Sequence, residues 1–163
     1  MSTAALVAGA GNVNSASAAD DYWVIGSLYL GYGNGCLTAS ATTNAVFTHT
    51  CEGWQAQDWE WVGIANSRGE QRLVSRTRGM CLATDNKSDR NAVWLSSCDT
   101  TAGQYWKWDN ANQYLRSNWT FGAHDQTLRA SSPGSGSVYS SGVQNDETYL
   151  DIPERMHVWY KAN

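Results

Sequence analysis

Short apolar runs, rich in β-branched or aromatic residues, are separated by polar turn residues along this chain, and one pattern of runs recurs. In its clearest copy, a run opens at Cys81 and a second run ends at Cys98. Gln104 and Trp106 then form a Gln-x-Trp motif. Short β-branched or aromatic runs between Gly, Asn, Asp and Ser clusters are typical of strands and turns. Because no sustained 3.6-residue periodicity accompanies them, the pattern predicts an all-β chain.

Two further copies of this pattern lie on either side of the clearest one. Cys36 precedes Cys81 by 45 residues, and Thr127 follows Cys81 by 46 residues. A near-constant period of this length indicates a repeat architecture. We expect three pseudo-repeats, over about 26–69, 70–110 and 111–163, that close into one threefold β domain. The corresponding positions are Cys36, Cys51, Gln57 and Trp59 in the first copy, and Thr127, His157 and Trp159 in the third.

Aromatic residues supply much of the bulk available for a core. The 163 residues include nine Trp and eight Tyr but only two Phe, and they suffice for one domain. The tryptophans of the Gln-x-Trp segments are predicted to fill the core where the repeats meet. These core candidates are Trp59, Trp61, Trp106, Trp108 and Trp159. Candidates for exposure are Trp54, Trp94 and Trp119.

Charge and hydropathy exclude some classes of function. The formal net charge is −4, which gives no reason to expect a nucleic-acid partner. No apolar run is long enough to cross a bilayer. One segment is rich in arginine, and we interpret it as a solvated strand face rather than a phosphate-binding track. Its arginines are Arg68, Arg72, Arg76 and Arg78.

The four cysteines form two similarly placed pairs, each within one repeat. Cys36 and Cys51 make the first pair, and Cys81 and Cys98 the second. The competing hypothesis is a metal site built from all four thiolates, but no C-x-x-C spacing supports it. Two intra-repeat disulfides are therefore predicted, which is typical of a secreted protein.

The first 25 residues are expected to lie outside the repeats. Residues 1–19 are uncharged and end in Ala16-Ser17-Ala18, a pattern typical of a signal-peptide cleavage site. Secretion is therefore expected. Residues 20–25 are interpreted as an N-terminal arm that either packs over the barrel as a plug or binds a partner. The partner-binding candidates in this arm are Tyr22, Trp23, Val24 and Ile25.

The third repeat departs from the other two. It contains no cysteine, and His157 stands where the others have Gln. Two of its loops are enlarged, over 131–137 and 144–155, and enlarged loops on a rigid scaffold often carry specificity. The second loop adds apolar candidates for partner binding, namely Tyr149, Leu150 and Ile152.

At these motifs, over about 26–163, the chain resembles the ricin B-chain-like β-trefoil family. The resemblance rests on the Cys-Leu pairs, the second cysteines and the Gln-x-Trp motifs described above. It implies a β-trefoil with up to three pockets for galactose-type sugars. Each pocket of the family uses an Asp two residues after the first Cys, an aromatic residue two before the second Cys, and an Asn just before Gln-x-Trp.

None of the three repeats keeps that set of sugar-binding residues. A pocket without the carboxylate, ring and amide lacks the groups that offset desolvation of a sugar. Galactose binding in the manner of the family is therefore not expected. The Asp position holds Thr38, Ala83 and Arg129, the aromatic position holds His49, Ser96 and about Ser140, and the Asn position holds Ala56 and Gly103. A glycan site elsewhere is the alternative, with Trp94, Trp119 and Tyr139 as candidate stacking rings.

No catalytic, cofactor or metal site is predicted. The three histidines stand in unrelated positions without a nucleophile or metal motif. We therefore expect a secreted, non-catalytic binding module. The favoured hypothesis is an adaptor that binds other secreted proteins in an extracellular, toxin-like complex, by analogy with small secreted trefoil subunits. The alternative is a lectin for cell-surface or cell-wall carbohydrate.

Overall fold

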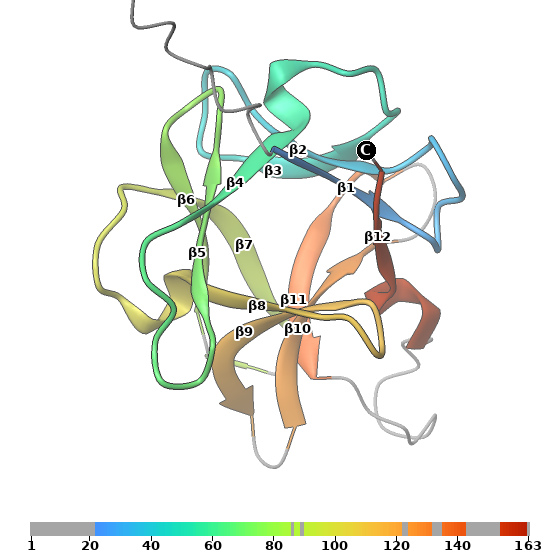
Figure 1. Cartoon of the computed structure of the whole chain (residues 1–163). Helices are drawn as coiled ribbons and strands as arrows, with labels where there is room; N and C mark the ends of the chain where they lie inside the picture. Colours follow the sequence, from blue (N-terminus) through green and yellow to red (C-terminus); the bar gives the residue numbers. More distant parts are fainter. Residues whose placement is uncertain are drawn as a thin grey trace, which may run out of the picture.

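In the computed structural model the chain folds as a β-trefoil. The structure describes residues 22–85, 87–88, 90–121, 124–131, 135–142 and 154–162. These residues form twelve strands and three short 3-10 turns (Figure 1). The strands are β1 (Trp23–Ser27), β2 (Cys36–Ala39), β3 (Val46–His49), β4 (Asp58–Val62), β5 (Gln71–Ser75), β6 (Met80–Thr84), β7 (Arg90–Ser96), β8 (Tyr105–Asp109), β9 (Tyr114–Phe121), β10 (His124–Ala130), β11 (Val138–Gly142) and β12 (Trp159–Lys161). The turns are η1 (Gln55–Gln57), η2 (Ala102–Gln104) and η3 (Glu154–His157). The all-β prediction is confirmed.

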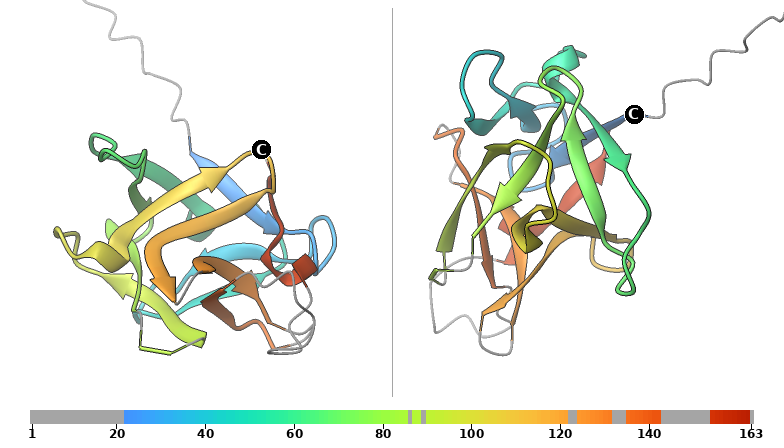
Figure 2. Two further views of the ribbon diagram at one scale, coloured as in Figure 1. Left: turned by 90° about the horizontal axis from the view of Figure 1, so that it is seen from below. Right: turned by 90° about the vertical axis from the view of Figure 1, so that its left-hand side faces the viewer.

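Six strands form the barrel. Antiparallel pairing runs from β12 to β1, β4, β5, β8 and β9 in turn. The backbone N–H of Trp159 donates to the carbonyl of Gln113 at 2.9 Å, which links the start of β12 to the residue before β9. Figure 2 shows β12 beside β1, where the N–H of Ala162 donates to the carbonyl of Val24 at 2.7 Å. These bonds bring the two ends of the series together and close the barrel.

Three hairpins cap the barrel, and each contacts the next. The hairpins are β2–β3, β6–β7 and β10–β11. Phe47 pairs with Ser137, Trp94 with Ala45, and Tyr139 with Ala92. Phe47, Trp94 and Tyr139 therefore occupy the same position in the three repeats, opposite a small residue of a neighbouring hairpin.

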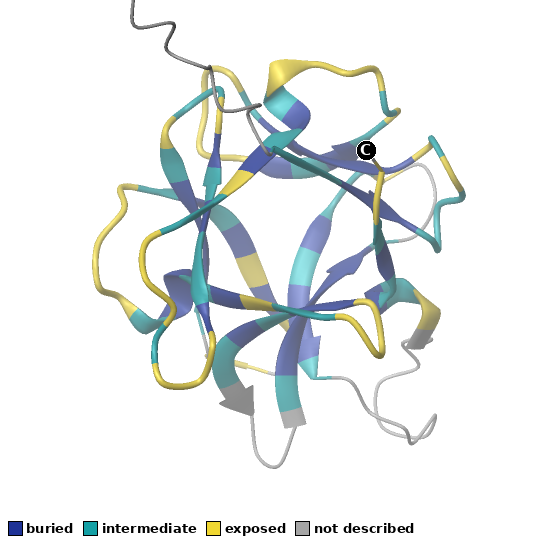
Figure 3. Ribbon diagram, in the orientation of Figure 1, coloured by how far each residue is buried: buried dark blue, intermediate teal, exposed yellow. Residues whose placement is uncertain are grey.

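The core repeats three times around the barrel, and each barrel strand carries buried residues (Figure 3). Strands β1, β5 and β9 each contribute one fully buried aliphatic residue, and the three Gln-x-Trp or His-x-Trp segments each contribute a fully buried tryptophan. The core prediction is confirmed for those tryptophans, whereas Trp61 and Trp108 are only partly buried. The equivalent residues are Ile25, Leu73 and Leu115, followed by Leu37, Leu82 and Leu128, and then Trp59, Trp106 and Trp159.

The prediction of an N-terminal arm outside the repeats is wrong for residues 23–25, because they belong to β1. Trp23, Val24 and Ile25 lie within this first barrel strand, and Ile25 is fully buried in the core. The connection between β1 and β2 is longer than that between β5 and β6, so Ile25 and not Leu28 is the counterpart of Leu73. These three residues are thus part of the barrel, and Ile25 is inaccessible to a partner.

No helix in the described part of the chain has the length and apolar character needed to traverse a bilayer.

Candidate functional site

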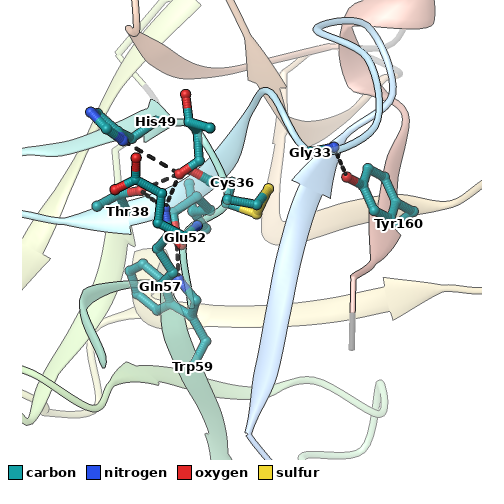
Figure 4. The surroundings of a disulfide bond; sticks show 11 residues. Gly33, Cys36, Thr38, His49, Glu52, Gln57, Trp59 and Tyr160 are labelled. Carbon is teal, nitrogen blue, oxygen red and sulfur yellow. Dashed lines mark hydrogen bonds between the residues drawn. A yellow bond between two sulfur atoms is a disulfide. The ribbon is translucent and has the colours of Figure 1, made fainter. Parts of the chain in front are cut away.

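The Gln-x-Trp motifs fix the hairpin ends from which a binding site would be built. In repeat one, Gln57 Nε2 donates to the carbonyl of Thr50 at 2.7 Å, and Gln57 Oε1 accepts from the N–H of Glu52 at 2.9 Å. The Trp59 indole N–H donates to the carbonyl of Leu37 at 2.9 Å. Figure 4 shows Gln57, Glu52 and Thr38 around the first disulfide. Backbone on both sides of Cys51 is therefore held in place.

Repeat two uses the same arrangement. Gln104 bonds the carbonyl of Ser97 at 2.8 Å and the N–H of Asp99 at 2.9 Å, and Trp106 donates to the carbonyl of Leu82 at 2.8 Å. Both predicted disulfides are present, Cys36 to Cys51 and Cys81 to Cys98, each with a Cα–Cα distance of 5.1 Å.

In repeat three, His157 takes the place of the glutamine. Its Nδ1 shares a hydrogen bond of 2.6 Å with the hydroxyl of Thr127. Burial, and after it the nearby charge of Arg129, together lower the pKa of His157 from 6.5 to about 3. Thus His157 is neutral at ordinary pH and serves as a structural residue.

Repeat one presents a half-exposed aromatic pair at the position where the family keeps its stacking ring. The ring of His49 lies against that of Trp54, with centroids 5.0 Å apart and planes inclined by 30°. Trp54 is 48% exposed. Beside His49 lies a cleft of about 380 Å³, lined by apolar and polar groups. Its lining residues are Leu30, Asn34, Thr48, His49, Thr50, Ser135 and Gly136.

The contact between His49 and Trp54 was not predicted from the sequence. Trp54 was predicted only as a candidate for exposure, and His49 was interpreted as the loss of an aromatic ring. Imidazole is itself a planar ring. A histidine at the aromatic position, followed by a tryptophan without a predicted core role, could therefore have indicated the pair. The turn at Gly53, which has φ of 68°, lies between His49 and Trp54, and their contact could not be read from spacing alone.

The slot of repeat two that corresponds to the one containing His49 is closed by neighbouring protein atoms. A Cβ atom on Gly103 would lie 1.9 Å from the carbonyl oxygen of Thr84 and 2.9 Å from Trp119 Nε1. No side chain fits at the Asn position of this repeat. Ala83, at the Asp position, is 3% exposed. A family-type sugar pocket therefore cannot form here.

Repeat three carries a cation at its Asp position. Arg129 is 4% exposed, and its guanidinium lies over the ring of Tyr139, 5.1 Å from the ring centroid. A second guanidinium, that of Arg90, lies 5.7 Å from the same centroid.

The three candidate stacking rings lie on different strands. Trp94 on β7 and Tyr139 on β11 are half-buried at equivalent cap positions. Trp119 on β9 is also half-buried, and its indole nitrogen is buried beside the Gly103 backbone. Tyr139 faces two arginines rather than another of the proposed rings. Their role in glycan binding stays a prediction.

The partner-binding candidates are only partly within the described residues. The guanidinium of Arg76 lies 4.1 Å from the ring centroid of Tyr22. Tyr149, Leu150 and Ile152 lie outside the described residues.

The arginine-rich segment does not form one track. Each of its side chains reaches a different neighbour, so their charges are spread around the surface. Arg68 contacts Asn118, Arg72 contacts the carbonyl of Asp99, Arg76 pairs with Asp58, and Arg78 contacts the carbonyl of Thr43.

A larger polar cleft of about 570 Å³ lies between the β8–β9 hairpin and the β4–β5 loop. Arg116 pairs there with Asp109 at 2.7 Å and with Asp125 at 2.5 Å. Hydrogen bonds from Asn112 and Arg116 lower the pKa of Asp109 to about 2. The three cations that line the cleft balance its three carboxylates, so we interpret the ion pairs of Arg116 as a structural link between β8, β9 and β10. Within the described stretches, no three His, Cys, Asp or Glu side chains are grouped to hold a metal ion.

The barrel, the cap and the Gln-x-Trp anchors define a β-trefoil of lectin type. The model of the ricin-type β-trefoil lectin domain matches residues 25–148. The chain belongs to this family. A search of curated proteins finds no significant match.

Three solved structures illustrate the likeness in fold. The designed 3-fold symmetric protein ThreeFoil matches with a TM-score of 0.63 and 19% identity, over 85% of this chain and 95% of that one. The β-trefoil lectin of Vibrio vulnificus hemolysin/cytolysin, with N-acetyl-D-lactosamine bound, matches with a TM-score of 0.59 and 18% identity, over 86% and 92%. The ricin B-like lectin of Macrolepiota procera, in complex with lactose, matches with 0.58 and 14%, over 85% and 91%.

Proposed function

We propose that this chain is a non-catalytic carbohydrate-binding module whose principal sugar contact is the His49–Trp54 pair. The observation that carries the proposal is that the exposed ring of Trp54 stacks on the ring of His49. His49 occupies the aromatic position of a family slot. Sugars bind proteins by laying an apolar face on such a ring while nearby polar groups bond their hydroxyls.

The pair is preorganised, which lowers the entropy lost on binding. Trp54 immediately precedes η1, and its carbonyl accepts from the backbone N–H of Gln57 at 2.8 Å. The Gln57 side chain holds Thr50 and Glu52, which flank Cys51. The disulfide therefore fixes the segment between the two rings.

Hydrogen-bonding groups lie close enough to complete a sugar site. Asn34 and Thr50 line the cleft beside His49, and Glu52 is exposed next to the disulfide. They would replace the missing Asp and Asn of the family. The lactose and N-acetyl-D-lactosamine bound by the two lectins of similar fold make these sugars the first probes to test.

The test compares binding of lactose and N-acetyl-D-lactosamine to the wild-type chain and to Trp54→Ala by titration calorimetry. We expect saturable binding that Trp54→Ala weakens by about tenfold or more. The matched control is Ile64→Ala, because Ile64 is 96% exposed on the β4–β5 loop. Equal binding by wild type and Trp54→Ala would overturn the proposal. A wider glycan array that yields no ligand would also overturn it.

A protein-interaction role is the second candidate function. What favours it is the absence of the family's carboxylate and amide from the three slots, together with the fully exposed Ile64. In this proposal the chain is an adaptor in an extracellular, toxin-like complex, and the two disulfides support an extracellular location. Purification of the tagged protein from culture supernatant tests it. Companions in fixed ratio would support an adaptor, and a clean monomer would exclude one.

A further inference from the structure

Arg129 is a buried cation without an acidic partner among the described residues. It is 4% exposed, and none of the ion pairs formed within the described stretches includes it. Among the described residues, its Nε is buried without a hydrogen-bond partner, and its Nη1 contacts the sulfur of Met156 at 3.8 Å. A buried, unpaired guanidinium is costly to a fold, and an anion would offset that cost.

The surroundings of Arg129 add positive charge rather than neutralising it. Arg90 on β7 faces the same Tyr139 ring from the neighbouring strand, with its guanidinium 5.7 Å from the centroid. Burial, and after it the charge of Arg90, lower the pKa of Arg129 to about 10, while Tyr139 acts in the opposite direction. His157 nearby is neutral. The Tyr139 ring partly compensates, since cations are attracted to an aromatic face.

Arg129 places a positive charge at the position of repeat three where the family has a negatively charged Asp. Arg129 stands two residues after Thr127, where the family has a carboxylate that accepts from sugar hydroxyls. A guanidinium has only donors, five in a planar fork that matches an oxyanion. Tyr139, directly opposite Arg129 in the β10–β11 register, supplies a half-buried ring beside that fork.

We propose that Arg129, Arg90 and Tyr139 form a binding site for the carboxylate or sulfate group of an acidic saccharide. Arg90, which is exposed, meets the anion first. Because Arg129 is almost covered, the Tyr139 or Met156 side chain must turn aside for the anion to reach it. The guanidinium groups then donate to the oxyanion while the tyrosine ring lies against the sugar. This site is separate from the His49–Trp54 pair and does not depend on it.

Calorimetric titration of the whole chain with 3′-sialyllactose, a sulfated disaccharide, lactose and sodium sulfate tests the proposal. We expect one of the two acidic saccharides to bind about tenfold or more tightly than lactose. This advantage should diminish as ionic strength rises from about 0.05 to 0.5 M. Equal affinities for the acidic saccharides and lactose would overturn the proposal. Sodium sulfate that binds as tightly as the saccharides would indicate a site for a free anion and would also overturn it.

Variants assign the effect to the site. Arg129→Met keeps an unbranched side chain, shorter than that of arginine, and removes an unpaired charge. It should fold at least as well as wild type, while the acidic saccharide should bind at least about tenfold more weakly. Arg90→Gln, at an exposed position, should weaken binding of the acidic saccharide several-fold. It provides a second test if Arg129→Met does not fold. Lys87→Gln removes one exposed charge elsewhere and should change nothing. Unchanged binding by a folded Arg129→Met or by Arg90→Gln would refute the assignment.

Discussion

The indole ring of Trp23 stands edge-on to that of Trp61, with centroids 5.8 Å apart and planes at 87°. Trp108 meets Trp23 in a similar way at 5.5 Å and 75°, and the ammonium of Lys161 lies 4.8 Å from the centroid of the Trp23 ring. Trp61, Trp108 and Lys161 each stand four residues after the Gln or His that anchors their repeat. Trp23 is therefore surrounded by the three repeats and closes that end of the barrel.

We expect Trp23→Ala to lower the free energy of unfolding by about 2–4 kcal/mol, because it removes the shared partner of two tryptophans at the barrel end. Urea unfolding followed by tryptophan fluorescence measures the change. Trp54→Ala is the matched control and should change stability by less than about 0.5 kcal/mol, since Trp54 lies on the surface. If both variants unfold at the same urea concentration, Trp23 does not close the barrel.

This closure also shows where sequence reasoning succeeded and where it stopped. The period of the Cys and Gln-x-Trp positions predicted the threefold fold and both disulfides, because each repeat must supply equivalent core residues. It did not place β1, because the connection between Ile25 and Cys36 is longer than its counterpart in repeat two. Counting back from Cys36 therefore aligned Leu28, and not Ile25, with Leu73. A local insertion breaks the spacing without breaking the sheet.

The candidate sites were less predictable than the fold. The family slots could be located in the sequence, which also shows that their carboxylates and amides are missing. The contact of His49 with Trp54 depends on the turn after Cys51, and the double contact of Tyr139 depends on β7 lying beside β11. Such contacts between neighbouring strands have no signature within either strand. The burial of Arg129 without an acidic partner in the described part of the chain is likewise a property of the packed structure.

Gly103→Ala should destabilise the protein by about 2–3 kcal/mol or more, because the added methyl group would overlap the Thr84 carbonyl oxygen, 1.9 Å from the Cβ position. Gly53→Ala provides a control without a steric clash. Nothing lies near its Cβ position, and only the left-handed φ of 68° opposes the change, at a cost of about 1 kcal/mol. Thermal unfolding compares the two. A larger loss for Gly53→Ala would show that repeat two has room for a side chain after all.

Replacement of both Cys81 and Cys98 by Ala should reduce stability by about 3 kcal/mol, since the disulfide closes a loop with a sequence separation of 17. The fold should persist, because Gln104 still bonds the backbone on both sides of residue 98. Circular dichroism and urea unfolding report the two effects separately. Wild-type stability in the double variant would mean that the Gln104 bonds alone hold the loop.

Replacement of His157 by the glutamine of the other repeats should abolish one source of acid sensitivity. The folded-state pKa of His157 is lowered from 6.5 to about 3, so the unfolded chain takes up a proton below about pH 6.5 while the folded chain does not. The stability due to this histidine is therefore fully present above pH 6.5 and is lost as pH falls toward 3, by at most about 1.4 kcal/mol per pH unit. Urea unfolding of wild type and His157→Gln between about pH 7 and pH 4 measures the difference. The gap between their stabilities should move in favour of the glutamine variant with each step toward acid. Parallel curves would mean that His157 accepts its proton in the folded state, which burial beside Arg129 opposes.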